Sequence, residues 1–549
     1  MSETIKPSGF KKWLSLFVLA LAVAIVVIDG TVLNVSIVNI TNDLGTDLKS
    51  IQWAFTSYSL VLASLTIFGG RLGDLFGRKK MFVLGAIIFG IGSLVTALAP
   101  NIGILILGWS IIEGIGAALM IPASSALLVS NFEGEDRGKA FAIYGATAGA
   151  ASAFGPILGG YLTTAFSWRW AFGINIFVVA ILALGSIIVK GYHQKPHKIS
   201  LDLLGVFLSS LGMGSITYGI IESSTYGWLQ AKKAFEFMGS SYDLAGISIT
   251  TYGVIFGLLV LVAFVFWELR QENLGNSPLI SMKIFLNKGF SIGIINVSLL
   301  FAGVSGLFTY GLAIFYQVVL GLSAFDSGIG FIPLSLATFL GAPLSNAIAK
   351  KIGQKRIVQV GILFGALGSL IIYFTLSLEA TRISLIPGLF VFGLGFGLMI
   401  AQVTNLILSS VPVTQAGVAS GINGTVREVG RTFGTALIGA AFLATLSSTI
   451  SDKINSNKAL AKTPEPIKQM VVTRVGLGDS SVLKQIPDVV GDQAKNEIIK
   501  EAHRSYVDGG KIAIIYTGVF LLVSFLISFT LPEGHELSDK EIVAAEVMD

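Results

Sequence analysis

Hydrophobic residues occur along the chain in long continuous runs, separated by short polar or glycine-rich stretches. The runs have roughly the 20 residues that an α-helix needs to cross about 30 Å of hydrocarbon. A membrane β-barrel would instead show alternating segments of about 10 residues. The pattern therefore predicts fourteen membrane-spanning helices, near residues 13–37, 50–69, 81–99, 102–129, 138–165, 171–189, 203–222, 247–268, 290–316, 327–349, 357–376, 382–410, 416–448 and 512–531.

The composition agrees with this pattern. The 549 residues are 53% hydrophobic and 13% charged, with a mean hydropathy of +0.79, which is typical of integral membrane proteins. The absence of cysteine excludes disulfides and thiolate metal sites. The sequence has no nucleotide-binding loop, paired histidines or nucleophile elbow, so we expect no metal, no cofactor and no enzymatic activity. An ion gradient is then the expected energy source.

Lysine and arginine mark one face of the membrane. They gather in the connections after the second, sixth and tenth predicted spans, whereas connections such as 98–102 and 320–327 have none. These basic residues are Arg71, Arg78, Lys79, Lys80, Lys190, Lys195, Lys198, Lys350, Lys351, Lys355 and Arg356. Because basic connections stay in the cytoplasm, we expect an inner (cytoplasmic) membrane protein with both termini in the cytoplasm. The net charge of +5 then reflects topology, not nucleic-acid binding.

Two similar turns divide the chain. The segments 70–80 and 342–356 are short basic turns that close the second and tenth spans. If the seventh and eighth spans are an inserted pair, the others form two six-helix bundles, a plan known from transporters with parallel repeats. We therefore expect an all-α membrane fold with an N-terminal bundle in 1–190, a linker with the inserted pair in 191–289, and a C-terminal bundle in 290–549. A substrate site is expected between the bundles.

The segment 451–510 interrupts this plan. It is polar and mixed in charge, and the span count places it outside the cell. A connection of this length is usually functional or disordered, and we expect a solvated or disordered loop. Within it, Val471–Val475 and Asn496–Val507 are expected to form short helices.

The turn at 70–80 reads Gly-Arg-Leu-Gly-Asp-Leu-Phe-Gly-Arg-Lys-Lys, in which glycines permit a tight turn and opposite charges lie at a helix end. It resembles the cytoplasmic signature loop of the major facilitator superfamily. The resemblance implies a latch that stabilises one access state, formed by Gly70, Arg71, Gly73, Asp74, Gly77 and Arg78. The alternative is a basic turn without a gating role, which gives Asp74 no use.

A second resemblance lies in the fifth span, where small residues recur around Gly155, Pro156, Gly159 and Gly160. Such residues let helix backbones approach closely, and proline adds a bend. The segment resembles the antiporter signature of exporter branches, and 167–175 is similar to the branch of fourteen-span drug:proton antiporters. Helix packing without a transport role is the alternative. Together the two segments imply export.

Asp29 lies well inside the first span, where a charge costs about 2.5–3.5 kcal/mol. A carboxyl group removed from water favours its neutral form, so we expect Asp29 to bind and release a proton during transport. Its Asp-x-Thr-x-x-Asn context resembles the first span of the same antiporters, although Val38 replaces their usual proline. A structural aspartate that is hydrogen-bonded to helix ends is the alternative.

The fourth span holds a second acid, Glu113. The segment 110–118 resembles a family motif that has arginine and glutamine where this chain has Ser110 and Glu113, so an arginine-assisted proton relay is not expected. Glu113 is instead expected to bind protons or attract cations. The thirteenth span carries three charged residues expected to form structural ion pairs, namely Arg427, Glu428 and Arg431.

Polar and aromatic residues of several spans are expected to line an amphipathic substrate cavity, although aromatic residues near span ends also serve as interface anchors. The candidates are Asn34, Gln52, Trp53, Tyr58, Phe308, Tyr316, Gln317, Gln402 and Asn405.

The resemblance and the intramembrane acids imply a proton-coupled antiporter that exports drug-like, lipophilic or cationic small molecules. We expect it to work as a monomer among membrane lipids, with no nucleic-acid partner. Export of an endogenous lipid, siderophore or metabolite is an alternative that uses the same motifs. An alternative of another class is a non-transporting membrane sensor or scaffold that uses the segment 451–510.

Overall fold

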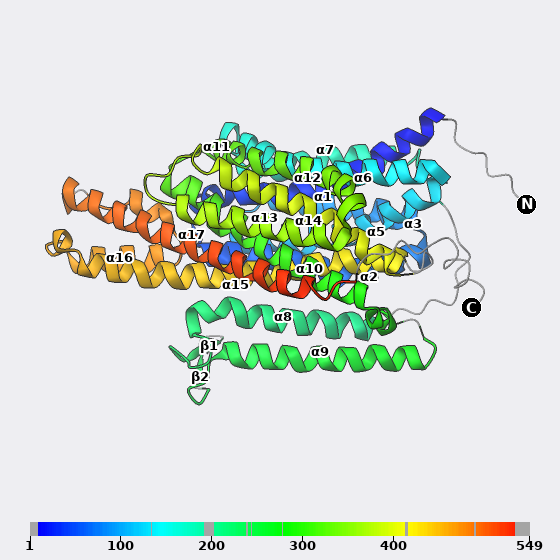
Figure 1. Cartoon of the computed structure of the whole chain (residues 1–549). Helices are drawn as coiled ribbons and strands as arrows, with labels where there is room; N and C mark the ends of the chain where they lie inside the picture. The colour runs from blue at the N-terminus through cyan, green and yellow to red at the C-terminus, as the bar shows by residue number, and fades with distance from the viewer. Residues whose placement is uncertain are drawn as a thin grey trace, which may run out of the picture.

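The computed structural model describes residues 9–132, 134–191, 202–237, 240–242, 244–276, 278–411, 416–487 and 490–532. Nearly all of these residues lie in long helices that run side by side (Figure 1). The helices of the first part of the chain are α1 (Gly9–Leu44), α2 (Leu48–Phe76), α3 (Arg78–Ala97), α4 (Ile102–Leu105), the π-helix η1 (Ile106–Glu113), α5 (Gly114–Asn131), α6 (Gly134–Ala165) and α7 (Trp168–Gly185).

The middle of the chain contributes α8 (Leu203–Tyr226), β1 (Phe235–Phe237), β2 (Ser240–Tyr242), α9 (Ile249–Asn273) and the short η2 (Met282–Leu286). The last part contributes α10 (Lys288–Gly306), the π-helices η3 (Leu307–Ala313) and η4 (Phe315–Val319), α11 (Ala324–Gly330), α12 (Ile332–Ile352), α13 (Gln354–Thr375), α14 (Ile386–Ser409), α15 (Ala416–Ser456), η6 (Lys458–Leu460), α16 (Glu465–Gly476), η7 (Ser480–Lys484) and α17 (Asp492–Ser528).

Thirteen of the fourteen predicted spans are confirmed. Within the described residues, thirteen helical segments are long and apolar enough to cross a membrane. The remaining predicted span, 138–165, lies in α6, which is 32 residues long and packs against α1 and α11. The molecule is therefore an all-α membrane protein, as the hydrophobic runs predict.

The helices form two apolar cores. One core consists mainly of residues from α1 to α7, such as Leu19 and Phe82, and the other mainly of residues from α10 to α14, such as Phe290 and Phe392. We call α1 to α7 the N-terminal half and α10 to α17 the C-terminal half, although α15 to α17 also contribute residues to the first core. α1 begins and α17 ends at one side of the molecule, the terminal side, and α16 lies at the opposite side, the α16 side (Figure 1). The domain boundaries at 190 and 290 stay predictions.

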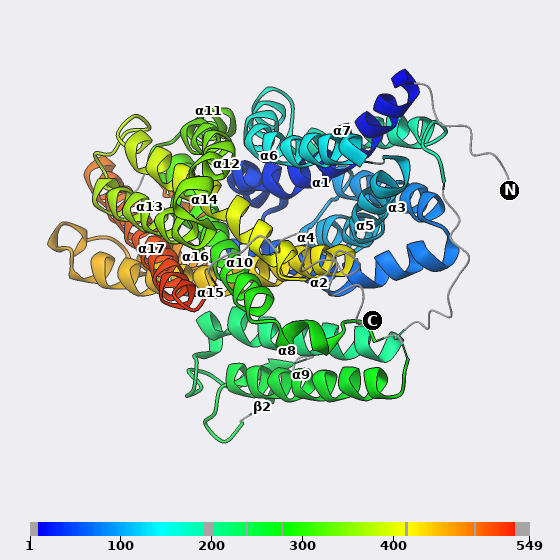
Figure 2. The ribbon, with the colours of Figure 1, turned by 45° about the vertical axis from the view of Figure 1, so that its right-hand side comes forward.

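The inserted pair α8 and α9 lies along one edge of the molecule (Figures 1 and 2). A short antiparallel hairpin of β1 and β2 follows α8 on the α16 side. α8 contacts both α2 and α15, so it covers the line where the two halves meet. An ion pair of 2.8 Å joins Lys49 Nζ of α2 to Glu222 Oε2 of α8, and the rings of Trp53 and Tyr218 lie 5.8 Å apart.

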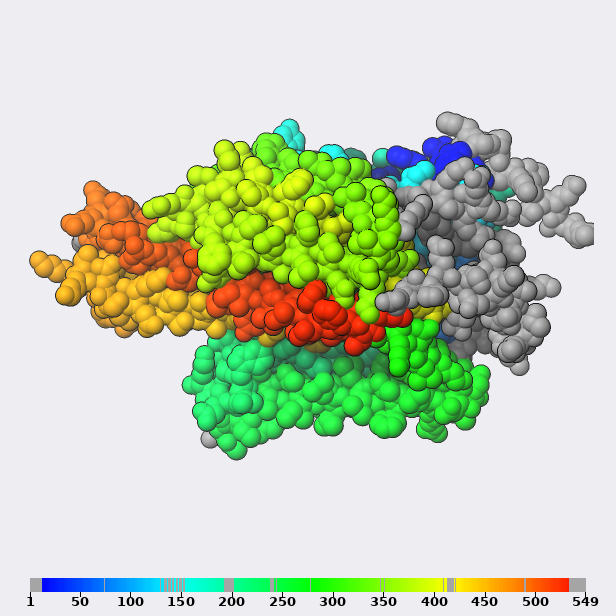
Figure 3. Space-filling view, in the orientation of Figure 1, coloured from blue at the N-terminus to red at the C-terminus, as the bar shows by residue number. Residues whose placement is uncertain are grey.

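The expectation of a solvated or disordered loop at 451–510 is wrong for the part that the structure describes. α15 continues to Ser456, and α17 begins at Asp492, well before the last predicted span. Both stretches expected to be helical are helical. Val471–Val475 lies in the short α16, whereas Asn496–Val507 belongs to the long α17 rather than to a short helix of its own. Figure 3 shows this region, in orange, projecting from the α16 side.

The fold of this segment has a hydrophobic cause. Val471 and Ile498 are fully buried and belong to the same core as Ile40 and Leu48 of the N-terminal half. The Leu48 backbone N–H also donates to the Leu477 carbonyl at 3.2 Å. Burial of these apolar side chains offsets the entropy lost on ordering a polar segment.

Close approach of α10 and α15 leaves Gly434 without room for a side chain, because a β-carbon there would lie 2.1 Å from the Ala302 carbonyl oxygen. We expect Gly434→Ala to destabilise the protein by about 1–3 kcal/mol through overpacking. On the same helix a β-carbon at Gly424 meets nothing within 4 Å, so Gly424→Ala should melt at or above the wild-type temperature. Thermal unfolding in detergent compares the variants, and equal melting temperatures would contradict the close approach.

Candidate functional site

Asp29 and Glu113, which belong to different spans, lie in one buried hydrogen-bond network. The Asn175 amide of α7 donates to Asp29 Oδ1 at 3.1 Å and to Glu113 Oε1 at 3.2 Å. The Trp109 indole donates to Asp29 Oδ2 at 2.7 Å, and the Ser93 hydroxyl donates to Glu113 Oε1 at 2.6 Å. Each of these five side chains is at most 2% exposed. The structure thus brings the two predicted proton-coupling residues together, away from water.

A π-helical turn shapes the fourth span at this network. η1 lies between α4 and α5 and ends at Glu113, and π turns inside α-helices are frequent at functional sites. Its wider turn changes the direction of side chains relative to a regular α-helix. Trp109 and Glu113, both within η1, point into the same network. Ser110, at the position where the family motif has arginine, donates instead to the Ala54 carbonyl of α2 at 2.8 Å.

Aromatic rings hold Trp109 in place. The Tyr58 ring stacks on the indole, with 4.7 Å between centroids and 5° between planes. The rings of Phe55 and Phe172 meet it edge-on at 5.5 and 6.3 Å. The Tyr58 side chain is only 2% exposed, so this predicted cavity residue forms part of the wall around the acid network.

α15 brings charged groups of the C-terminal half toward the same part of α1. Arg431 Nη1 lies 3.4 Å from the position of a β-carbon on Gly30, which directly follows the buried aspartate. Arg431 pairs with Glu428 at 3.5 Å, as expected for the charged set of the thirteenth span. Arg427 points elsewhere and donates to the Thr404 hydroxyl at 2.9 Å. The ion pair therefore lies at the contact between the two halves.

The predicted antiporter motif packs α6 against both halves. A β-carbon on Gly155 would lie 1.9 Å from the Thr31 hydroxyl, two residues beyond the buried aspartate on α1. A β-carbon on Gly160 would lie 2.4 Å from a backbone carbonyl oxygen of α11, in the C-terminal half. Gly159 likewise lies against α1, and Pro156 lies against α11. Small residues are required here because three backbones approach closely.

Two predicted cavity residues join the halves directly. The Thr309 hydroxyl of η3 donates to Asn34 Oδ1 of α1 at 3.0 Å. Gln52 Nε2 of α2 donates to the carbonyls of Thr435 and Ala436 on α15, at 3.3 and 2.8 Å. Asn34 and Gln52 belong to the parts of α1 and α2 nearer the α16 side. These hydrogen bonds, like the contact of Gly160, therefore join the halves toward that side.

The other predicted cavity residues take part mainly in helix packing. Trp53 lies against α8, as described above. Phe308 and Tyr316 pack against the same phenylalanine ring, at 5.2 and 5.7 Å between centroids. Gln317 and Gln402 are buried and hydrogen-bonded within the C-terminal half, whereas Asn405 is exposed. Their role in lining a substrate cavity stays a prediction.

The predicted latch forms the turn between α2 and α3. Gly77, between the two helices, has a φ of 101°, a conformation that favours glycine. Arg71 donates to the Pro278 carbonyl in the connection that follows the inserted pair. Arg78 Nη1 donates to the Ala126 carbonyl of α5 at 3.4 Å.

The remaining latch residues are Gly70 and Gly73, which lie at the end of α2. A β-carbon on Gly70 would lie 3.5 Å from Pro122 of α5. The side chain of Asp74 lies outside the described residues, as do Lys195 and Lys198. Because the contact of Asp74 is not described, the gating role of this turn stays a prediction.

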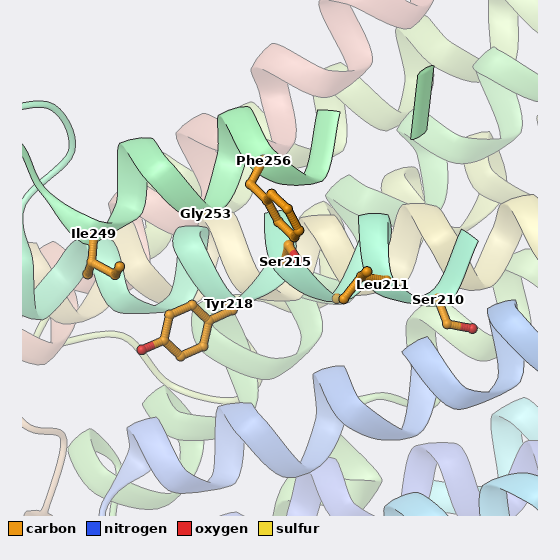
Figure 4. Close-up of a pocket in the computed structure, with 8 residues that line it drawn as sticks. Ser210, Leu211, Ser215, Tyr218, Ile249, Gly253 and Phe256 are labelled. Atoms are coloured by element: carbon orange, nitrogen blue, oxygen red, sulfur yellow. The ribbon is translucent and has the colours of Figure 1, made fainter. Parts of the chain in front are cut away.

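A shallow groove lies on the inserted pair (Figure 4). Its lining residues come from α8 and α9, and they are Ser210, Leu211, Gly214, Ser215, Tyr218, Ile249, Gly253 and Phe256. None of them belongs to the acid network. The ring contact of Tyr218 with Trp53 connects the groove to the predicted cavity set.

The sequence did not single out the residues that donate hydrogen bonds to the two acids. Asn175 is the last residue of the segment 167–175, which resembles part of the drug:proton antiporters. An amide inside an apolar run is only a weak indication of a functional residue. Trp109 and Ser93 gave none, because tryptophan and serine are common in membrane helices. Only the packing of α1, α3, η1 and α7 shows that they contact the carboxyl groups.

Residues 19–435 match the model of the Major Facilitator Superfamily. The chain is 32% identical over 465 residues to the probable actinorhodin transporter of Streptomyces coelicolor, covering 83% of this chain and 77% of that protein. It is 30% identical over 446 residues to the puromycin resistance protein pur8 of Streptomyces alboniger, covering 80% and 84%. A bacterial homolog to the human lysosomal transporter Spinster has a similar fold, with a TM-score of 0.59 at 15% identity over 96% of this chain and 98% of that chain.

The lack of native cysteine allows a direct test of the contact between the halves. Because the Asn34 and Thr309 side chains meet at 3.0 Å, we expect the double variant Asn34→Cys, Thr309→Cys to cross-link in membranes under mild oxidation. A protease site inserted between the halves makes the cross-link visible, since the fragments then stay together on a non-reducing gel. The two single variants serve as controls. Fragments that separate in the double variant would contradict the contact.

Proposed function

This chain belongs to the Major Facilitator Superfamily, and we propose that it exports drug-like, lipophilic or cationic molecules across the cytoplasmic membrane in exchange for protons. It is a multi-pass membrane transporter of small molecules. The observation that carries the proposed coupling is the buried pair of Asp29 and Glu113, joined through Asn175.

Export of drug-like compounds is supported by the relatives. One is named for the transport of actinorhodin and another for resistance to puromycin. Both are at least 30% identical to this chain over most of its length. A transporter that removes such compounds from the cell needs an energy source, and the chain contains no nucleotide-binding loop.

A proton gradient supplies that energy in the proposed mechanism. One proton that moves down 100 mV releases about 2.3 kcal/mol, and each pH unit adds about 1.4 kcal/mol. To use this energy, a buried group must bind the proton in one access state and release it in the other. Carboxyl groups removed from water are suited to this, since a proton neutralises their charge.

The proposed cycle couples the acid pair to the contact between the halves. A proton from outside binds the pair, the substrate leaves outward, and release of the proton to the cytoplasm accompanies the next loading. The position of α1 supports this coupling, because it carries Asp29 and, next to it, contacts α6 at Thr31 and α15 at Gly30. A change of charge at the acid pair therefore changes the electrostatic interactions at the contact between the halves.

The orientation in the membrane belongs to the same proposal. Arg71 and Arg78 lie at the turn between α2 and α3, on the terminal side. By the positive-inside rule that side faces the cytoplasm, and the α16 side faces outward. Both termini are then cytoplasmic, and the contacts of Asn34 and Gln52 with the C-terminal half close the outer side.

The coupling is tested with purified protein in liposomes under an imposed pH gradient, with the cationic dye ethidium as the probe. With one proton exchanged per molecule, one pH unit supports about a tenfold accumulation of dye. We expect Asp29→Asn and Glu113→Gln to abolish this accumulation while dye exchange without a gradient persists. Asp452→Asn removes an exposed carboxylate on α15 and should accumulate dye like the wild type. Accumulation by both acid variants at the wild-type level would overturn the proposal.

A further inference from the structure

The two acids of the network have different hydrogen-bond surroundings, and Asn175 is the group they share. We infer that Asn175 positions the Asp29 and Glu113 carboxyl groups as one unit, in which Glu113 carries the exchangeable proton and Asp29 carries the charge. This inference rests on the proposed proton coupling and names the group that performs it.

The contacts of Asp29 suit an ionised carboxylate. Its Oδ2 accepts a hydrogen bond from the Trp109 indole at 2.7 Å, and its Oδ1 accepts one from the Asn175 amide at 3.1 Å. An indole N–H and an amide NH₂ are donors only. Both oxygens of Asp29 therefore already have a donor, and hydrogen bonds to a charged group are stronger than those to a neutral one.

The contacts of Glu113 suit a protonated carboxyl group. Its Oε1 accepts from the Ser93 hydroxyl at 2.6 Å and from the Asn175 amide at 3.2 Å. Its Oε2 is buried and has no hydrogen-bond partner among the described residues. A bare oxygen of a buried carboxylate is costly. With the proton on Oε2, the group is neutral and this atom becomes a donor, so the buried site no longer holds a bare charged oxygen.

Charge leads to the same assignment. Among the residues that the structure describes, neither acid forms an ion pair, so two ionised carboxylates would repel each other in a dry site. The Tyr58 hydroxyl of α2 lies near both acids and also near Glu428 and Arg431 of α15, which already pair with each other. Arg431 Nη1 lies 3.4 Å from the position of a β-carbon on Gly30, the residue after Asp29. One proton on the pair leaves a single negative charge near this ion pair.

Asn175 controls how readily the proton leaves. Its NH₂ group has two hydrogens, and Asp29 Oδ1, Glu113 Oε1 and the Ser93 hydroxyl all lie within 3.2 Å. When Glu113 loses its proton, the two hydrogens of Asn175 stabilise one carboxylate each. Removal of this amide stabilises the protonated form relative to the charged one, so the pair should keep its proton to higher pH.

The location of the proton is tested by infrared spectroscopy of the purified full-length protein in liposomes, which needs no substrate. The wild type should show the C=O stretching band of a buried protonated carboxyl group that disappears as the pH rises. Glu113→Gln should lack this band, and Asp29→Asn should retain it. A band that persists in Glu113→Gln, a band lost only in Asp29→Asn, or a wild type without such a band overturns the assignment.

The role of Asn175 is tested by the pH midpoint of the same band. Asn175→Leu, which has no donor, should shift the midpoint upward by about one pH unit. Ser93→Ala, which removes one donor from Glu113 alone, should shift it less, and Asn175→Gln should restore it toward the wild-type value. A purely structural residue would change folding without moving the midpoint. An unchanged midpoint in folded Asn175→Leu, judged by a monodisperse elution profile, or a shift in Ser93→Ala as large as that in Asn175→Leu overturns the positioning role.

The two proposals fail in different experiments. If ethidium accumulation does not depend on the acids while the infrared band behaves as described, the proposed coupling through the acid pair is wrong and the proton assignment stands. If accumulation requires both acids but the band does not follow Glu113, the exporter stands and the assignment falls.

Discussion

A carboxyl group in the interior of a membrane protein must either find hydrogen-bond donors or keep its proton. The N-terminal half buries two such groups in one hydrogen-bond network, and the π turn of its fourth span contributes to it. The π turn at Ile106–Glu113 directs Trp109 and Glu113 toward α1. The aromatic rings around Trp109 keep water from the indole that holds Asp29. Without these neighbours, a charge at position 29 would destabilise the span.

In the proposed mechanism, the same constraint connects the acid pair to the movement of the halves. α1 carries Asp29 on one face and contacts α6 closely through Thr31 and Gly155. α6 in turn contacts α11 of the other half at Gly160. Packed helices respond to a change of charge by moving as bodies, since their interiors do not deform continuously. Glycine-lined contacts on both faces of α6 are suited to such movement. This offers a physical reason why an antiporter would have small residues at these positions.

Two parts of the chain lie outside the two bundles and contact both of them. α8 touches α2 and α15 along the line between the halves. The region around α16 belongs by sequence to the C-terminal half, yet its apolar residues join the core that contains Leu48 of α2. Both therefore connect the two halves in this structure. Neither contains acid-network residues, which is consistent with a structural contribution separate from proton binding.

Sequence alone predicted the features that depend on local pattern. Helix number follows from the length of hydrophobic runs, and the two acids stood out because a charge within such a run is costly. The polar composition of 451–510 predicted a solvated or disordered loop, and this prediction was wrong. A few buried apolar residues, such as Val471 and Ile498, suffice to order the segment. Several predicted cavity residues, among them Gln402 and Tyr316, are buried in helix packing, since a polar or aromatic residue in a span has the same sequence signature in either role.

Tertiary structure decided which groups meet. Residues 29, 93, 109, 113 and 175 lie on α1, α3, η1 and α7, and no spacing along the chain predicts that one amide reaches both carboxyl groups. It also distinguished the two acids, because donors surround both oxygens of Asp29 and only one of Glu113. The physical reason is that hydrophobic periodicity fixes which residues enter a helix, whereas hydrogen-bond partners depend on how separate helices pack against one another.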